Sequence, residues 1–205
     1  MKRIQKKNIN SPEEYNRIFK ENKELYSTFD FNRWNEMLKY FRGGSLVDLG
    51  CFNSFLTKIA KDKYKDSDIW GIDYADAVIA YMQKQFPNIH FMENDIYNLK
   101  LKNSSFNYAT AGELIEHLEN PRLFIKEAMR ILKPGGVLAI STPLEETGIG
   151  EIDKDRHLWS FSKQDIFDLL KPYGIVHFKI MRSERYPVYK YHFPIIVVFC
   201  QKYAE

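Results

Sequence analysis

The chain has 205 residues, of which 44% are hydrophobic and 28% charged, and its formal net charge is +3. These values fit one domain with a full α/β core, and so small a net charge indicates no particular class of partner. No apolar run is long enough to span a membrane, and the first seven residues, with four positive side chains, lack the apolar region of a signal peptide. We therefore expect a cytoplasmic protein without membrane contact, whose basic first residues form a solvated tail.

Two amphipathic helices are expected over residues 12–41, ahead of the sheet. The Ser-Pro pair at residues 11–12 suits a helix cap and first turn, and apolar residues then recur at helical spacing. A glycine pair ends this portion. We expect a single domain over residues 1–205, in which residues 1–42 form an N-terminal helical cap and residues 43–205 form the core.

The stretch from Ser45 to Leu56 changes from a short apolar run, typical of a strand buried on both faces, into a helical pattern. In an open α/β sheet such a turn lies at the carboxyl end of the strand, where backbone N–H groups at the helix start face a ligand. Gly50 lets the chain pass close to that ligand. The stretch therefore predicts the floor of a cofactor site.

A second strand is expected over residues 68–73, and it ends in an acid. Asp73 follows Gly50 by 23 positions, close to the offset at which a carboxylate meets ribose hydroxyls in nucleotide-binding βαβ units. One carboxylate can accept hydrogen bonds from both hydroxyls of a ribose. An acid at a strand end is also a common helix cap, here for a helix over residues 75–86, and the sequence leaves both roles open.

The rest of the chain continues the alternation of strands and helices. A polar loop over residues 142–160 is expected at the ligand edge of the sheet. In the helix expected after residue 120, Leu123, Phe124, Ala128, Ile131 and Leu132 should face the sheet. We expect strands over residues 87–92, 105–111, 137–141, 175–181 and 193–200, and helices over residues 121–132 and 162–170.

Two segments resemble a known family. The sequence Asp-Leu-Gly-Cys at residues 48–51 matches the first motif of the class I S-adenosylmethionine-dependent methyltransferases, usually Val-Leu-Asp-Leu-Gly-Cys-Gly-Thr-Gly. The second and third glycines of that motif are replaced by Phe52 and Ser54, so either the loop is re-bent or the Phe52 ring packs away from the ligand. From residue 113 to residue 143 the chain closely resembles small-molecule methyltransferases of the ubiquinone and menaquinone biosynthesis type.

The resemblance implies a doubly wound, Rossmann-like α/β sheet of seven strands in the order 3-2-1-4-5-7-6, with strand 7 antiparallel. It also implies S-adenosylmethionine as the cofactor and S-adenosylhomocysteine as its product. In this family an acid followed by an apolar residue, here Asp95 and Ile96, reads the adenine, and Tyr74 would lie near it. The cofactor-binding residues are expected to be Asp48, Gly50, Cys51, Phe52, Asp73, Tyr74, Asp95, Ile96 and Glu113.

Methyl transfer from a sulfonium is an in-line displacement, so the protein chiefly aligns donor and acceptor. A base is needed when the acceptor holds its proton at neutral pH, and His117 and His157 stand in segments that should border the pocket. We expect these two imidazoles to be catalytic; the alternative is that each only orients its own segment. The resemblance implies a transferase of class EC 2.1.1 acting on a small molecule, and we favour oxygen as the methyl acceptor.

A metal-dependent alternative remains open. Glu113, Glu116, His117 and His157 resemble an arrangement with which some 2′-O-methyltransferases of small RNA ends hold a divalent metal, and RNA would then be the substrate. The same Glu-His pair also occurs in relatives that use no metal. The sequence therefore assigns no metal ligand, and a nucleic-acid partner is disfavoured but not excluded.

A non-catalytic relative is another alternative, because Phe52 and Ser54 stand where the family motif has glycines.

Cys51 and Cys200 are the two cysteines of the chain, and their spacing bears on the redox state of the protein. Neither lies in a Cys-x-x-Cys spacing, so we expect two reduced thiols and no zinc site.

Overall fold

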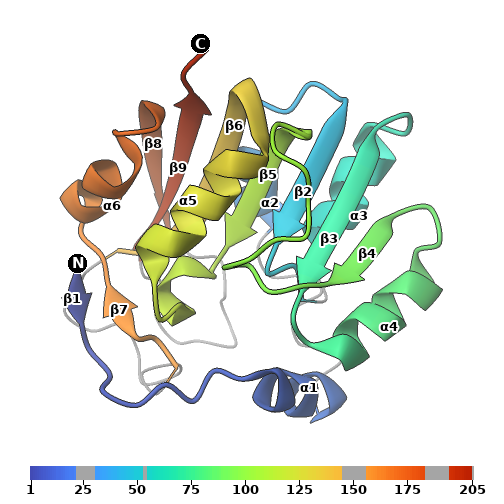
Figure 1. Ribbon diagram of the computed structural model, residues 1–205, viewed down its shortest axis with the longest axis horizontal. Coiled ribbons are helices and arrows are strands. Elements are labelled where there is room, and N and C mark those ends of the chain that lie inside the picture. Colours follow the sequence, from blue (N-terminus) through green and yellow to red (C-terminus); the bar gives the residue numbers. More distant parts are fainter. Residues whose placement is uncertain (22–30, 53–54, 145–155, 183–193, 205) are drawn as a thin grey trace.

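A seven-stranded sheet forms the centre of the computed structural model, which describes residues 1–21, 31–52, 55–144, 156–182 and 194–204 (Figure 1). The strand order is β4-β3-β2-β5-β6-β9-β8, and β9 runs antiparallel to both of its neighbours. Numbered along the chain within this sheet, the order is 3-2-1-4-5-7-6, so the predicted topology is confirmed. The strands are β2 (Ser45–Leu49), β3 (Asp68–Asp73), β4 (His90–Glu93), β5 (Phe106–Gly112), β6 (Leu132–Pro143), β8 (Gly174–Arg182) and β9 (Pro194–Lys202).

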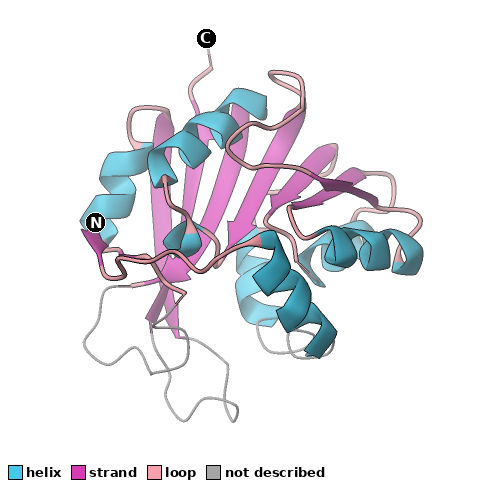
Figure 2. Cartoon of the chain, turned by 60° about the horizontal axis from the view of Figure 1, so that its bottom comes forward, coloured by secondary structure: helices cyan, strands magenta, loops and turns pink. Residues whose placement is uncertain are grey.

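Helices cover both faces of the sheet (Figure 2). Successive side chains of a strand point to opposite faces, so in β2 Leu46 packs into one apolar cluster and Val47 and Leu49 into the other. The first cluster also contains side chains of α1 to α4, and the second contains side chains of α5 and α6. The helices are α1 (Pro12–Glu21), α2 (Phe31–Met37), α3 (Phe55–Lys63), α4 (Asp76–Gln85), α5 (Pro121–Ile131) and α6 (Lys163–Leu170), with a short 3-10 helix η1 (Ile115–His117).

Side-chain caps explain where the two last helices begin. The side chain of Asn120 accepts a hydrogen bond from the backbone N–H of Leu123, and Pro121 occupies the first turn of α5. Ser162 and Asp165 form a reciprocal capping box at the start of α6. Both helices lie where the sequence predicted them.

Three local expectations were wrong. Leu123 does not face the sheet but is 38% exposed, because it lies on the same side of α5 as the exposed Lys126, three residues later. The fifth strand is longer than expected, since β6 already begins at Leu132, which pairs with Phe106. The basic first residues are not a solvated tail: β1 (Lys2–Arg3) pairs antiparallel with β7 (Trp159–Ser160).

The two cysteines, Cys51 and Cys200, are buried and form no disulfide, as expected for reduced thiols. Among the helices of the described ranges, none combines the length and the apolar character that crossing a bilayer would need.

The packing of α5 generates a paired prediction. Phe124 is fully buried between α5 and the sheet, so Phe124→Ala is expected to lower the free energy of unfolding by about 3–5 kcal/mol through lost burial and a cavity. Leu123→Ala, one residue earlier and partly exposed, should cost less than about 1 kcal/mol. Urea unfolding followed by circular dichroism measures both values, and equal costs would contradict the orientation of α5.

Candidate active site

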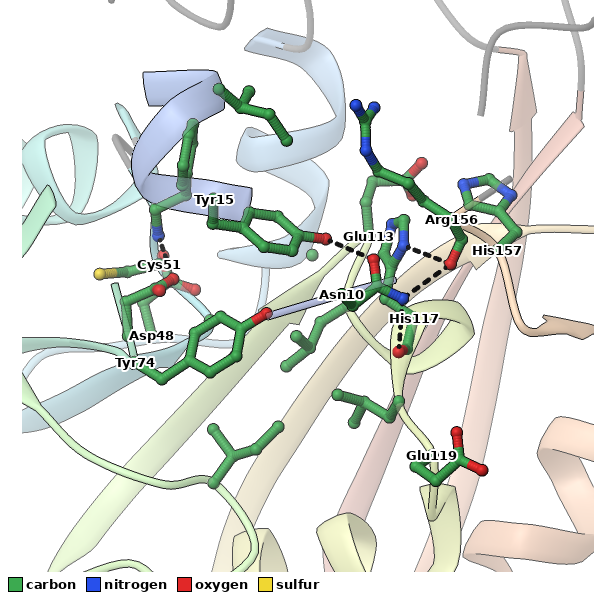
Figure 3. Close-up of a pocket in the computed structure, with 18 of the residues that line it drawn as sticks. Asn10, Tyr15, Asp48, Cys51, Tyr74, Glu113, His117, Glu119, Arg156 and His157 are labelled. Carbon is green, nitrogen blue, oxygen red and sulfur yellow. Dashed lines mark hydrogen bonds between the residues drawn. The ribbon is translucent and has the colours of Figure 1, made fainter. Parts of the chain in front are cut away.

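A cavity of about 260 Å³ lies between the carboxyl ends of β2, β3 and β5 and the N-terminal segment of the chain (Figure 3). The structure brings all nine expected cofactor residues and both expected catalytic imidazoles to its walls. Their positions therefore agree with one site, while the role of each remains a prediction. The lining includes Asp48, Gly50, Cys51, Phe52, Asp73, Tyr74, Asp95, Ile96, Glu113, His117 and His157.

The turn after β2 is held against β3 and requires glycine at its first position. Gly50 has a φ of +69°, in the left-handed region, and an added Cβ would lie 2.7 Å from the side chain of Leu114. The next residue, Cys51, donates its backbone N–H to the carbonyl of Ile72 in β3 at 2.8 Å. The turn is thus fixed close to the cavity floor.

Phe52 shows how the missing second glycine of the motif is accommodated. Its backbone is bent into the left-handed region, with a φ of +42°, and its ring packs edge-on against Tyr15 and Phe19 of α1 at centroid distances of 5.9 and 6.0 Å. The position of this ring relative to a bound ligand stays a prediction. The ring borders the cavity and holds α1 over it without filling it; Ser54 lies outside the described residues.

The Asp73 carboxylate links two turns. One oxygen accepts a hydrogen bond from the backbone N–H of Phe52, and the other accepts from Ala75 at the start of α4, both at 2.9 Å. Burial raises the pKa of Asp73, and the hydrogen bonds from backbone N–H groups oppose that rise. The carboxylate thus closes the turn before α4 but does not cap that helix, whose N-cap residue is Ala75, and each oxygen keeps a further lone pair for a ribose hydroxyl.

Aromatic and apolar side chains form the wall above β3 and β4. The rings of Tyr74 and Tyr15 lie 5.7 Å apart, and Ile96 and Tyr97 border the same space. Burial raises the pKa of Tyr74 well above its usual value, so its hydroxyl stays protonated. The Asp95 carboxylate accepts from the backbone N–H of Tyr97 at 2.9 Å, which fixes an acid at the rim of this wall.

A buried ion pair, which the sequence analysis missed, closes another side of the cavity. Arg33 of α2 pairs with Glu113 at 2.8 Å, and both side chains approach the Ser141 hydroxyl at 3.3 Å. Arg33 stands next to Trp34 in an amphipathic pattern, where a charged residue normally indicates the solvated face. No local signal distinguishes this buried arginine from a solvated one, because its partner lies far along the chain.

Glu116 and two imidazoles gather at the other end of the cavity. The rings of His117 and His157 lie 4.7 Å apart, and Nδ1 of His117 donates to the carbonyl of Arg156 at 3.2 Å. Glu116 is 1% exposed, and its Oε2 accepts from the Thr142 hydroxyl at 2.9 Å. Burial, and then the nearby Glu113 carboxylate, raise the pKa of Glu116 well above its usual value.

Asn10 joins the N-terminal segment to this end of the site, and the sequence analysis did not find it either. Its side-chain amide donates to the carbonyls of His117 and Arg156 at 3.1 and 2.9 Å (Figure 3). Nearby, Ile4 donates its backbone N–H to the carbonyl of Leu158 at 2.8 Å. Asparagine is common in turns before helices, so its residue type alone does not indicate a contact with His117 and Arg156. Only the folded chain shows that contact.

The raised pKa of Glu116 generates a pH prediction. The folded protein holds this proton at pH values where the unfolded chain, with a pKa near 4.5, has lost it. Below pH 4.5 the carboxyl is protonated in both states, so its burial as a charge costs no stability. As the pH rises from 4.5 through the pKa of Glu116 in the folded protein, the free energy of unfolding falls. Gln has no charge to bury and can still accept from Thr142, so Glu116→Gln should gain stability relative to wild type as the pH rises above 4.5.

Urea unfolding at a series of pH values in metal-free buffer measures this difference. A stability difference between Glu116→Gln and wild type that stays constant across the range would contradict the raised pKa. Asp68→Asn, which removes an exposed carboxyl at the other end of β3, serves as the control variant.

Comparison with known proteins shows what the central part of the chain is similar to. Residues 47–140 match the family model of the methyltransferase domain. A probable S-adenosylmethionine-dependent methyltransferase of Mycolicibacterium smegmatis is 28% identical over 101 residues, which are 49% of this chain and 38% of that protein. A ubiquinone biosynthesis O-methyltransferase of Coxiella burnetii is 30% identical over 106 residues, 49% of this chain and 44% of the relative. The chain thus spans less than half the length of these relatives.

A solved structure from Thermotoga maritima, an S-adenosylmethionine-dependent methyltransferase described as a possible histamine N-methyltransferase, has the same fold. It superposes with a TM-score of 0.72 over 92% of this chain and 98% of that one, at 19% identity. The domain match and the strand order agree with the resemblance carried by residues 48–51 and 113–143. Residues 47–140 of the chain are thus similar to the methyltransferase domain, and the fold is the one seen in this solved structure.

Proposed function

We propose that the chain transfers a methyl group from S-adenosylmethionine to an oxygen atom of a small-molecule acceptor. The observation that carries the proposal is that Gly50, Asp73 and Asp95 line the same cavity as His117 and His157. One end of the cavity is thus suited to an adenosyl group and the other to removing a proton. The relative named as a ubiquinone biosynthesis O-methyltransferase supports an oxygen acceptor on a small molecule rather than RNA.

The residues at the first end fit an adenosyl group. Gly50 borders this end of the cavity, and Asp73 would hold the ribose hydroxyls. Tyr74 and Ile96 offer apolar faces for the adenine, and Asp95 offers an acceptor for its amino group. When bound, the cofactor supplies an electrophilic methyl group on a sulfonium.

The second end would take the acceptor and its proton. As the oxygen of the acceptor forms its bond to the methyl carbon and the bond from that carbon to sulfur breaks, the hydroxyl proton must leave. Because Nδ1 of His117 donates to the carbonyl of Arg156, the other ring nitrogen, Nε2, carries the lone pair that can receive a proton. His157 lies against this ring, so we assign the proton transfer to the pair. The buried thiols of Cys51 and Cys200 suit a reducing cytoplasm.

Calorimetric titration with S-adenosylhomocysteine tests cofactor binding. Asp73→Asn is expected to weaken binding at least about tenfold, because hydrogen bonds to a charged group are worth about 1.5–3 kcal/mol. Asp68→Asn, the same substitution at the other, exposed end of β3, should bind like wild type. No measurable heat with the wild-type chain at tens of micromolar would favour the non-catalytic alternative instead.

Transfer of a radiolabelled methyl group to a panel of phenols and carboxylic acids tests the catalytic assignment. Replacing His117 or His157 with Ala is expected to lower kcat by about 10²–10⁴ for the residue that handles the proton. Affinity for S-adenosylhomocysteine should stay within about threefold of wild type, since the imidazoles are at the acceptor end. His90→Ala, on the exposed part of β4, is the matched control. Unchanged kcat in both variants would remove the imidazoles from the mechanism.

A further inference from the structure

We propose that Glu116, His117 and His157 form a binding site for one divalent transition-metal ion at the acceptor end of the cavity. Each residue offers one ligand atom, and these three atoms all lie within 4.8 Å of one another. Two imidazole nitrogens and one carboxylate oxygen are a donor set suited to manganese, iron, cobalt or zinc. Glu113 is not part of the set, because its carboxylate is paired with Arg33.

The strongest support is a buried oxygen without a partner. Oε2 of Glu116 is held by the Thr142 hydroxyl, but Oε1 has no hydrogen-bond partner among the described residues, although the side chain is almost fully buried. Buried polar atoms are nearly always paired, because an unpaired one costs about 1–3 kcal/mol. A cation beside Oε1 would satisfy this atom and would balance the charge of the carboxylate.

The surrounding contacts orient the three side chains as ligands. His117 donates from Nδ1 to the carbonyl of Arg156, the contact by which a metal-binding histidine usually fixes its ring and leaves Nε2 as the ligand. Leu158 donates its backbone N–H to the carbonyl of Glu116 at 2.7 Å, which holds the segment carrying His157 beside the carboxylate. The Thr142 hydroxyl fixes the carboxylate itself.

Distances and charges are compatible with an ion. Ligand atoms about 2.1 Å from one ion lie roughly 3–3.5 Å apart, so atoms within 4.8 Å of one another need to approach by up to about 1.3–1.8 Å. The half-buried imidazoles can make this movement by rotation of their side chains. The neighbouring guanidinium groups are each paired with a carboxylate, Arg33 with Glu113 at 2.8 Å and Arg156 with Glu14 at 3.3 Å.

The consequence for catalysis rests on the proposed function. An ion with open positions facing the cavity would bind the acceptor oxygen and lower the pKa of its proton. His117 and His157 would then act as ligands, and the ion would take over the task of acidifying the hydroxyl. Loss of activity in the histidine variants is expected in either case, so the deciding measurement is metal binding itself.

Titration of the full metal-free chain with Co²⁺ and with Mn²⁺ tests the site directly. We expect one ion per chain by calorimetry, with visible absorption bands for Co²⁺ that report nitrogen ligands. Glu116→Gln and His157→Ala should each weaken binding by at least about tenfold. His177→Ala removes an exposed histidine of β8 and should leave binding unchanged.

Two results would overturn the proposal. One is the absence of saturable binding up to millimolar metal, and the other is equal binding by wild type, Glu116→Gln and His157→Ala, which would indicate an adventitious surface site. Urea unfolding shows whether each variant is folded. Glu116 and His157 lie in different segments of the chain, so the two substitutions are independent tests of the site. Titration with S-adenosylhomocysteine in the same samples separates the two hypotheses. If the chain binds S-adenosylhomocysteine but no metal, the metal site alone is contradicted. If it binds metal but no S-adenosylhomocysteine, the proposed function alone is contradicted.

Discussion

The buried carboxylate of Asp73 is the constraint on which the site depends. It accepts hydrogen bonds from the turn after β2 and from the turn after β3, at Phe52 and Ala75. These strands are parallel neighbours, with Leu49 opposite Ile72, so their turns emerge at the same sheet edge. Each N–H group would otherwise be buried without a partner, at a cost of about 1–3 kcal/mol. Burial raises the pKa of Asp73, and the hydrogen bonds from backbone N–H groups oppose only part of that rise.

The fold could be predicted because its signals are local. The apolar run of β2 followed by Gly50, the strand ending at Asp73, and the capped helix α5 each depend on residues close together in the sequence. Strand order then followed from the resemblance carried by residues 48–51 and 113–143. Leu123 shows the limit of such patterns: an apolar residue beside the buried stripe of a helix can still lie on its exposed side.

The missed parts of the site depend on partners far away in the chain. Arg33 is buried only because Glu113, 80 positions later, approaches it, and Asn10 matters only because it reaches Arg156, 146 positions later. The direction of the Phe52 ring likewise depends on where α1 packs. Residue type and spacing carry no information about such pairs, whereas Asp73 was identifiable because its offset from Gly50 is fixed by a single βαβ unit.

The balance of charge in the cavity links the proposed cofactor to the proposed ion. Its walls carry more carboxyl groups than guanidinium groups, and Arg33 is already neutralised by Glu113. In a partly buried space this excess attracts cations, and S-adenosylmethionine carries a positive sulfonium. Methyl transfer turns that sulfonium into a neutral thioether, so the attraction weakens once the reaction is complete, which favours product release. A metal ion beside Glu116 would supply the positive partner that this buried carboxyl lacks among the described residues.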